Sequence, residues 1–483
     1  MRVLFVTPEL VPLIKLGGIG EGLGALVRAL RMLGEQVTVA LPAHRAIMGV
    51  ELTPRAGDPI VLHDGGGEVV VRVLEGRLPD GTEVLVFDTE ELSTRAEIYG
   101  DDMHDPKNAR RFALFSRAVV QLARNESVAG NPFDVLHVHE WPCAVVPYLA
   151  REVGAELSRT RTVITLHNLA HQGIFPSDCL AALGLGPEHA HPDKLGFHGH
   201  VNFMQGGILA ADAITTVSPT YAREIQEPSF GEMLDGCLRH RADRLVGLLN
   251  GIDHVTWDPS RDAAIALAYD ADDLSGKAAC KQALLREVEL AESERPLLVS
   301  VGRLVPQKGS DLLAEALSGI LAEGVNVLVA GGGDVDLVQA MEHAAGREPG
   351  RSRYLGFVDD AMVHRLMAGA DLVAMPSRFE PCGIVQLYAL RYGAIPIAAR
   401  TGGLADTIDD AGEALDEDGT RGTGFLYDEP SSAGLLRAVK RAVHCMSRPT
   451  WPALQNRAMR QENSWGRRAA AYRDLYRRLG LRR

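Results

Sequence analysis

Residues 377–390 read Ser-Arg-Phe-Glu-Pro-Cys-Gly-Ile-Val-Gln-Leu-Tyr-Ala-Leu, and this stretch decides how we expect the second half of the chain to fold. A short apolar run at residues 370–375 precedes it and predicts a buried strand. Apolar residues at helical spacing follow from Ile384 onward. The segment therefore predicts a strand, a tight loop and a helix, which is the repeating unit of an open α/β sheet.

The loop of this segment carries groups that suit a sugar nucleotide. Backbone N–H groups at a helix start have no partner within the helix, and the helix dipole adds partial positive charge there. We therefore expect Cys382 and Gly383, at the predicted helix start, to bind phosphate. Glu380 lies just before them, so its carboxylate can accept hydrogen bonds from sugar hydroxyls. An ordinary loop with a surface glutamate would show the same spacing.

Length, composition and charge limit the class of protein. A chain of 483 residues suits two domains, and an apolar content of 46% is ample for their cores. The net charge of −13 argues against a nucleic-acid partner and means that local lysines and arginines must hold any anionic ligand. Six cysteines without paired spacing predict reduced thiols. With no signal-peptide or membrane-length apolar run, we expect a cytoplasmic protein without a membrane partner.

A glycine-rich loop lies near the start of the chain, between a strand at residues 3–6 and an amphipathic helix. It runs from Lys15 through Gly18 to Glu21. Glycines let the backbone approach a ligand closely, and Lys15 supplies a positive charge for phosphate. The G-x-G-x-x-G spacing of a dinucleotide fold is not met, which argues against a nicotinamide dehydrogenase.

Two further strands of the first half end in polar residues. His139 and Glu140 follow the strand that begins at Asp134, and His167 and Asn168 follow the next one. Ligands of open parallel sheets bind beyond the carboxyl ends of the strands, where these residues fall. A histidine in such a place can be a base or a metal ligand, or it can belong to a polar loop without a chemical role.

The second half repeats the pattern of cations beside turns. Arg303 and Lys308 flank a short turn after a strand at residues 296–302. Two cations on one such loop can straddle a diphosphate, although a solvated charge pair would look the same. The later segment from Arg400 to Asp406 resembles the Lys15 loop in its glycine pair and its acid. Both loops are expected to face one interdomain cleft.

The stretch from Ser377 to Gly383 resembles the signature of bacterial glycogen synthases and plant starch synthases, and the likeness covers nearly the whole chain. The resemblance implies an α/β protein of the GT-B fold, with two Rossmann-like doubly wound domains facing a central cleft. The implied domains are residues 1–255 on the acceptor side and 256–455 for the nucleotide sugar, with a C-terminal helix at 456–483 that crosses back to the first domain. It also implies a retaining transfer of glucose from ADP-glucose to the non-reducing end of an α-1,4-glucan, as in glycogen biosynthesis.

The resemblance also assigns roles to residues that match the family's motifs. The implied catalytic residues are Glu380, His167, Arg303 and Lys308. The implied donor-binding residues are Lys15, Gly18, Asn250, Phe357, Cys382, Gly383 and Tyr99. The implied acceptor-side residues are Glu21, Glu140 and Asn168. In the family, the backbone carbonyl and the ring of the histidine at the position of His167 lie beside the anomeric carbon. We expect neither a metal nor pyridoxal phosphate, because the chain's own cations replace the metal and no pyridoxal-binding lysine motif occurs.

Two other interpretations stay open. The chain could be another GT-B transferase with a different donor or acceptor, or a glucan-binding protein that has lost catalysis. Tyr388 stands where many GT-B enzymes have a second, ribose-binding glutamate, and this favours the starch-synthase branch. The departures from the family pattern include Glu140, His171, Gln205 and Val385, which leaves the acceptor less secure than the donor class. The sequence does not decide between ADP- and UDP-glucose, and it says nothing of oligomeric state or allosteric regulation.

Overall fold

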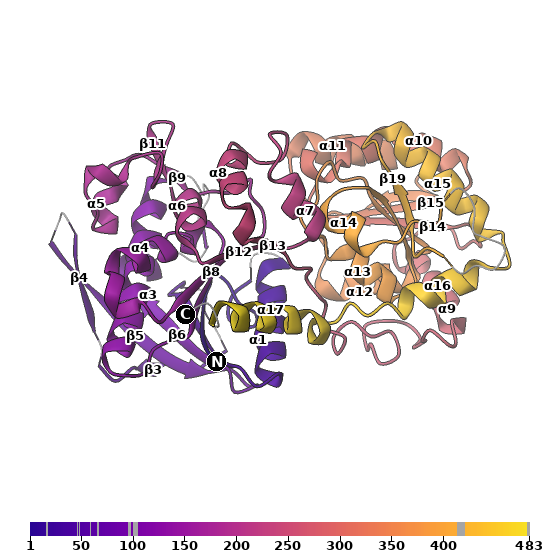
Figure 1. Ribbon diagram of the computed structural model, residues 1–483. Helices are drawn as coiled ribbons and strands as arrows, with labels where there is room; N and C mark the ends of the chain where they lie inside the picture. Colours follow the sequence, from indigo (N-terminus) through magenta and orange to yellow (C-terminus); the bar gives the residue numbers. More distant parts are fainter. Residues whose placement is uncertain are drawn as a thin grey trace. The chain divides into compact units, whose positions relative to one another are not determined.

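The computed structural model describes residues 1–15, 18–45, 47, 49–57, 59–64, 67–94, 98–99, 105–412 and 421–480. Leu16 and Gly17, in the loop between Lys15 and Glu21, lie outside these ranges. The chain divides into two compact units, which Figure 1 shows: Met1–Asn250 with Trp465–Arg483, and Gly251–Ser464.

The division differs slightly from the predicted one. The first unit ends at Asn250 rather than at residue 255, and the returning tail starts at Trp465 rather than at residue 456. The reason is that helix α16 (Trp451–Met459) belongs to the second unit, where Leu454 and Met459 are buried in the core.

The second unit contains a six-stranded parallel sheet in the order β16-β15-β14-β17-β18-β19. The strands are β14 (Leu297–Val301), β15 (Asn326–Ala330), β16 (Ser352–Tyr354), β17 (Leu372–Met375), β18 (Ile395–Ala399) and β19 (Phe425–Tyr427). Numbered along the chain, the order is 3-2-1-4-5-6, that of a Rossmann fold. The order reverses between β14 and β17, so a ligand crevice is expected beyond their carboxyl ends.

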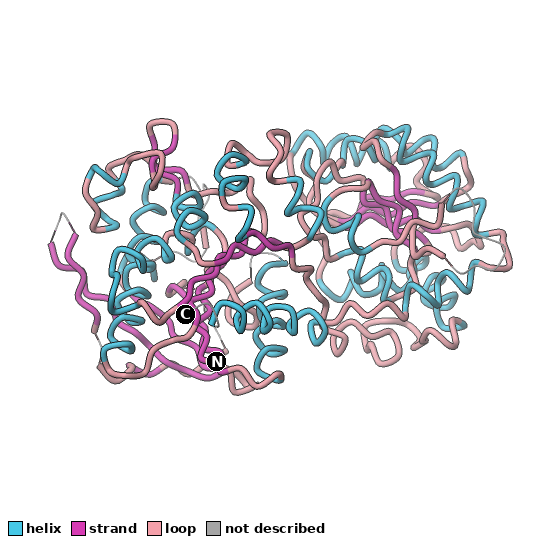
Figure 2. Tube along the Cα trace, in the orientation of Figure 1, coloured by secondary structure: helices cyan, strands magenta, loops and turns pink. Residues whose placement is uncertain are grey.

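Helices cover both faces of this sheet, as Figure 2 shows. They are α9 (Ser275–Glu287), α10 (Ser310–Ala322), α11 (Val335–Ala345), α12 (Asp360–Gly369), α13 (Val385–Arg391), α14 (Gly402–Thr407), α15 (Ser432–Met446) and α16. The strands β15, β17 and β18 are buried throughout, as expected for a parallel sheet covered on both faces.

The first unit contains a ten-stranded sheet, of which nine strands follow the order β13-β12-β8-β7-β1-β2-β6-β5-β3, with β4 paired to β5. The strands are β1 (Arg2–Val6), β2 (Gln36–Pro42), β3 (Thr53–Pro54), β4 (Ile60–Asp64), β5 (Gly67–Arg77), β6 (Glu83–Asp88), β7 (Val135–His139), β8 (Arg161–Leu166), β12 (Ala213–Thr216) and β13 (Leu245–Gly247). The part from β13 to β6 is parallel, and its order reverses between β1 and β7. Strand β6 pairs parallel with β2 and antiparallel with β5, so β5 and β6 form a hairpin at the end of the parallel part.

The helices of the first unit are α1 (Gly18–Met32), α2 (Glu90–Ser93), α3 (Pro106–Val128), α4 (Val146–Val153), α5 (Cys179–Leu183), α6 (Phe203–Ala210), α7 (Pro219–Glu224), α8 (Asp235–His240) and α17 (Trp465–Gly480). A small sheet of β9 (Ile174–Phe175), β10 (Gly196–Phe197) and β11 (His200–Asn202) completes the unit. Helix α17 lies beside α1 and buries Trp465 and Tyr476 in the same core as Leu23 of α1 (Figure 1). None of the helices in the described ranges is long and apolar enough to cross a membrane.

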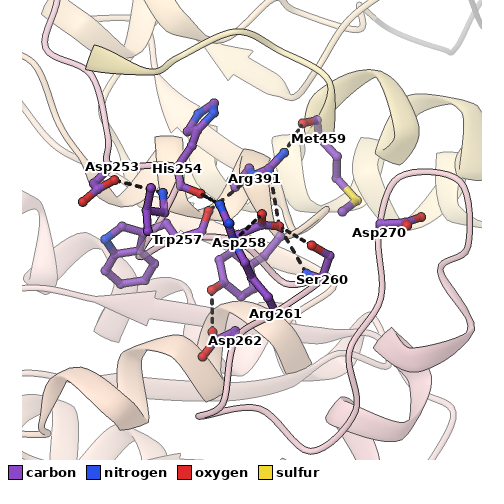
Figure 3. A network of polar contacts seen from close by, with 12 residues as sticks. Asp253, His254, Trp257, Asp258, Ser260, Arg261, Asp262, Asp270, Arg391 and Met459 are labelled. Carbon is purple, nitrogen blue, oxygen red and sulfur yellow. Dashed lines mark hydrogen bonds and ion pairs between the residues drawn. The ribbon is translucent and has the colours of Figure 1, made fainter. Parts of the chain in front are cut away.

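Polar and aromatic contacts fix the segment after Gly251 to the rest of the second unit (Figure 3). The Arg391 guanidinium lies 3.0 Å from Asp258 and donates to the backbone oxygen of Trp257 at 3.3 Å. The Trp257 ring stacks on Tyr388, with ring centroids 3.5 Å apart. These contacts hold the first residues of the unit against α13, the helix that follows the Glu380 loop.

Candidate active site

In the second unit, the loops that follow β14 and β17 are packed tightly together. A Cβ atom on Gly309 would lie 2.0 Å from the backbone oxygen of Pro376, so only glycine fits there. The backbone N–H of Arg378 donates to the Gln307 oxygen at 2.9 Å. The Arg378 guanidinium also pairs with both carboxylate oxygens of Asp311, at 2.8 and 2.6 Å. The two loops therefore form one body at the point where the strand order reverses.

This packing brings together two residues predicted to be catalytic. Lys308 Nζ lies 2.5 Å from Glu380 Oε2. The Ser377 hydroxyl donates to the same oxygen at 3.1 Å. The Glu380 carboxylate is buried, whereas Lys308 is partly exposed and can reach a ligand. Ser377 was missed as a site residue, although it lies three positions before Glu380 in the same motif.

The loop after β18 closes against the Glu380 loop through a glycine pair. The N–H of Gly403 donates to the backbone oxygen of Glu380 at 3.0 Å. Cβ atoms on Gly402 and Gly403 would lie 2.0 Å from the Glu380 oxygen and 2.1 Å from the Cys382 oxygen. The glycine pair of the Arg400 segment thus serves close backbone packing within the unit.

The predicted helix start at Cys382 and Gly383 is wrong. Helix α13 begins at Val385, because Gly383 has a left-handed backbone (φ 72°) that cannot continue a helix. Cys382 and Gly383 form the turn before it, and the Gln386 amide donates to their backbone oxygens at 2.9 and 3.2 Å. The N–H groups that this turn can offer a phosphate are therefore its own, and α13 begins two residues after it.

Arg303 and Phe357 lie at the same edge of the sheet, beyond the carboxyl ends of β14 and β16. The Arg303 side chain is exposed and has no polar partner within the described part of the chain. Phe357 is 90% exposed, which is unusual for a large apolar ring. Hydrogen bonds from Gly331 N–H to the Gly356 oxygen (2.7 Å) and from Leu304 N–H to Gly332 (2.8 Å) link the loops that carry them. A free cation and a free aromatic ring at one sheet edge suit a nucleotide.

In the first unit, the polar residues after β7 and β8 form a second cluster. Glu140 Oε1 accepts hydrogen bonds from the backbone N–H groups of His167 (2.6 Å) and Asn168 (3.1 Å). The His139 and His167 rings are joined through Nδ1 and Nε2, 3.2 Å apart. Glu140 takes a left-handed backbone (φ 65°), which is strained for a residue with a side chain. Such strain, held by two loops at a strand end, is typical of functional sites.

Burial sets the charge state of this cluster. Burial, and to a lesser extent the Glu9 carboxylate, raise the pKa of Glu140 to about 8, against the two backbone hydrogen bonds that it accepts. Burial also lowers the pKa of His167 to about 4. The His167 imidazole is therefore neutral at physiological pH, and its ring can offer one donor and one acceptor.

The remaining predicted residues of the first unit lie in varied surroundings. Lys15 pairs with Glu21 at 2.5 Å on the surface, and Gly18 begins α1. Tyr99 stacks on Trp141 with centroids 5.7 Å apart, and burial raises the pKa of its phenol well above the usual value. The Glu140 carboxylate also raises the pKa of Tyr99, so this phenol lies near the Glu140 cluster.

The surroundings of Asn250, Asn168 and Gln205 are set by burial or by local hydrogen bonds. Asn250 is buried at the end of the unit. The Asn168 side chain accepts from the Ala170 N–H at 3.1 Å. Gln205, one of the departures from the family pattern, donates through its amide to the backbone oxygens of Pro192 (3.0 Å) and Gly196 (2.9 Å), so it supports a neighbouring loop.

Within the described ranges, no three His, Cys, Asp or Glu side chains are grouped so that they could hold a metal ion.

Comparison with known proteins relates this geometry to a family. A model of the starch synthase catalytic domain matches residues 2–240, and a model of glycosyl transferases group 1 matches residues 281–459. A glycogen synthase of Anaeromyxobacter dehalogenans (strain 2CP-C) is 44% identical over 491 aligned residues, covering 99% of this chain and 100% of that one. A glycogen synthase of Halorhodospira halophila (strain DSM 244 / SL1) is 42% identical, covering 99% and 98%. The chain belongs to the glycogen synthase family.

Solved structures agree with this family membership. The catalytic domain of starch synthase IV from Arabidopsis thaliana, bound to ADP and acarbose, matches with a TM-score of 0.88 and 30% identity over 99% of both chains. A sucrose-phosphate synthase from Thermosynechococcus elongatus shares the fold alone, with a TM-score of 0.60 and 16% identity. The predicted class, two Rossmann-like α/β units of the GT-B type, is confirmed for this member of the glycogen synthase family.

Proposed function

We propose that the protein is an ADP-glucose-dependent glycogen synthase. It transfers glucose from ADP-glucose to the non-reducing end of an α-1,4-glucan, with retention of configuration. The observation that carries the proposal is the Lys308–Glu380 pair at the reversal point of the second sheet, in a chain that matches glycogen synthases along its whole length. The starch synthase relative with bound ADP and acarbose supports an adenine nucleotide donor and a glucan acceptor.

The second unit holds the leaving group. Breaking the sugar–phosphate bond develops negative charge on the diphosphate, and fixed cations stabilise that charge without reorganising. The Arg303 guanidinium has no polar partner among the described residues, and the Lys308 side chain is partly exposed. Phe357 stacks on the base of the nucleotide. In the turn of Cys382 and Gly383, N–H groups add further donors to the phosphate.

Glu380 and His167 act on the sugar. Positive charge develops on the ring as the bond to phosphate lengthens, and the Glu380 carboxylate accepts hydrogen bonds from the sugar hydroxyls. The backbone carbonyl of His167 faces the anomeric carbon, held in place by the bond from its own N–H to Glu140. The first unit also supplies Lys15, Gly18, Tyr99 and Asn250 to the donor, and Glu21, Glu140 and Asn168 to the acceptor side.

The reaction requires neither a divalent metal nor pyridoxal phosphate, because the cations of the chain take the charge-stabilising role. The substrates are ADP-glucose and glycogen, and the protein acts in the cytoplasm without nucleic-acid or membrane partners. The chemistry of the residues and the family of the chain support these assignments.

The test is transfer of labelled glucose to glycogen from ADP-glucose and, in parallel, from UDP-glucose. Incorporation from ADP-glucose, with a kcat/KM well above that for UDP-glucose, is the expected result. A preference for UDP-glucose would overturn the donor assignment. Glycogen binding without transfer from either donor would instead favour a binding protein that has lost catalysis.

A further inference from the structure

Three histidines lie in a row in the core of the first unit: His137 and His139 at the end of β7, and His167 after β8. His137 uses both ring nitrogens, with Nδ1 2.7 Å from the Tyr476 hydroxyl and Nε2 2.6 Å from the Thr165 hydroxyl. His139 uses only one. Its Nδ1 lies 3.2 Å from His167 Nε2, whereas its Nε2 is buried and has no hydrogen-bond partner among the residues that the structure describes.

This unpartnered atom distinguishes two arrangements of protons. A neutral imidazole carries one N–H, and one N–H must lie between His139 Nδ1 and His167 Nε2. If His167 donates, the proton of His139 must sit on Nε2, where it would be a buried N–H group without an acceptor. If His139 donates, its Nε2 is only an unused lone pair. Orphaned N–H groups are rare inside proteins, so the second arrangement is favoured.

We propose that His139 is a positioning residue for transfer, which donates from Nδ1–H to His167 Nε2 and thereby places the His167 proton on Nδ1. This inference rests on the proposed function, because it makes His167 Nδ1–H a donor to a hydroxyl oxygen of the glucose being transferred. His167 is half-buried, and its Nδ1 has no hydrogen-bond partner in the described part of the chain. The donor is thus free to meet a ligand.

The surroundings hold both rings in this arrangement. Phe5 stacks on His139, with centroids 5.0 Å apart and planes 23° from parallel, and His137 lies 4.2 Å away on the same strand. The Glu140 carboxyl fixes the backbone N–H of His167. Burial lowers the pKa of His139 as well as that of His167. Both rings therefore stay neutral near pH 7, and each carries one N–H.

The direct test is nitrogen NMR of the full chain labelled with ¹⁵N-histidine, without substrate. The expected spectrum of His167, assigned by loss of its signals in His167→Gln, has a protonated Nδ1 and an unprotonated Nε2. A protonated Nε2 would overturn the proposal. This readout does not depend on activity, so it stands even if the protein transferred no glucose and the proposed function failed.

A pair of variants tests the consequence for catalysis. In His139→Asn the amide nitrogen can take the place of Nδ1–H, whereas the longer side chain of His139→Gln places its amide near Nε2. We expect His139→Gln to lower kcat about fivefold, the value of one neutral hydrogen bond, with an unchanged KM for glycogen. His139→Asn is expected to retain most of kcat and the His167 Nδ1 proton.

A matched control is His189→Gln, which replaces another buried histidine of the first unit, bonded to the Tyr148 hydroxyl. It should leave kcat and the His167 signals unchanged. Equal kcat in the two His139 variants would overturn the proposal. So would an equal loss of kcat in His189→Gln and His139→Gln, because the effect would then be one of core packing.

Discussion

Lys308 Nζ and Glu380 Oε2, 2.5 Å apart, join two loops that are 72 residues apart in the chain. Burying a carboxylate is costly unless it is paired and hydrogen-bonded, and Lys308 and Ser377 meet that need for Glu380. Lys308 therefore has two roles in the proposed reaction. It holds the carboxylate that faces the sugar, and it presents positive charge to the leaving phosphate.

Replacing Lys308 with alanine should lower kcat about a hundredfold while the KM for ADP-glucose changes much less. The charge meets negative charge that grows only in the transition state, and loss of one such partner typically costs about 3 kcal/mol. Steady-state kinetics over a range of ADP-glucose concentrations at saturating glycogen would separate the two constants.

The control for this variant is Lys440→Ala. Lys440 pairs with Glu323 at 3.1 Å on the surface of the same unit, and surface pairs are worth at most about 1 kcal/mol. We expect normal kinetics from it. A Lys308→Ala enzyme with near-normal kcat would remove Lys308 from the catalytic set.

Gly309→Ala should destabilise the protein much more than Gly324→Ala. Both glycines have left-handed backbones, with φ of 67° and 81°, so both substitutions cost about 1 kcal/mol of backbone strain. Only at Gly309 would the new methyl group meet the Pro376 oxygen, at 2.0 Å, whereas nothing lies within 4 Å at Gly324. Urea unfolding of the two variants measures the difference. Equal losses would mean that the β14 and β17 loops separate freely.

Glu140→Gln should become more stable relative to the natural protein as pH rises. The folded-state pKa of Glu140 is raised from 4.5 to about 8, so the folded state favours the protonated carboxyl. Its stabilising contribution is complete below about pH 4.5 and is lost as pH rises towards 8, by a few kcal/mol in all. Glutamine is neutral and keeps the oxygen that accepts from His167 and Asn168. Unfolding free energies of both proteins at pH 5 and pH 8 test this, and a constant difference would contradict it.

The sequence predicted the strands and the loops that bear the site because these depend on local patterns. The apolar run before Ser377 predicts a strand, and the residues between Arg303 and Lys308 predict a turn. Both patterns can be recognised within one short segment of sequence. The pairing of Lys308 with Glu380 has no such signal. It arises from the adjacency of β14 and β17, and strand periodicity does not specify which strands are neighbours.

The backbone conformation of the loop that carries Glu380 was also not predicted. Helical spacing after Ile384 suggested that the helix begins at Cys382, but one left-handed glycine, Gly383, delays it to Val385. The unpartnered nitrogen of His139 is likewise a product of packing, since it depends on which atoms from β1 and β8 surround the ring. Residue type alone could not distinguish it from an ordinary core histidine.

Transfer should continue after exhaustive chelation of divalent metals. In the proposed reaction, Arg303 and Lys308 supply the positive charge that stabilises the leaving diphosphate, so that reaction needs no metal ion. The measurement is glucose incorporation into glycogen after dialysis against a chelator, compared with the same enzyme after magnesium is restored. Activity that disappears and returns only with magnesium or manganese would contradict this prediction.

Val385→Thr should strengthen donor binding. Val385 is the first residue of α13 and follows the turn of Cys382 and Gly383, where a threonine hydroxyl could donate to the diphosphate and valine cannot. A hydrogen bond to a charged group is worth roughly 1.5–3 kcal/mol, so the KM for ADP-glucose should fall about tenfold or more while the KM for glycogen stays the same. Val443→Thr, at a half-buried position of α15, is the matched control and should change neither constant. An unchanged donor KM in Val385→Thr, or an equal change in the glycogen KM, would show that the start of α13 does not contact the diphosphate.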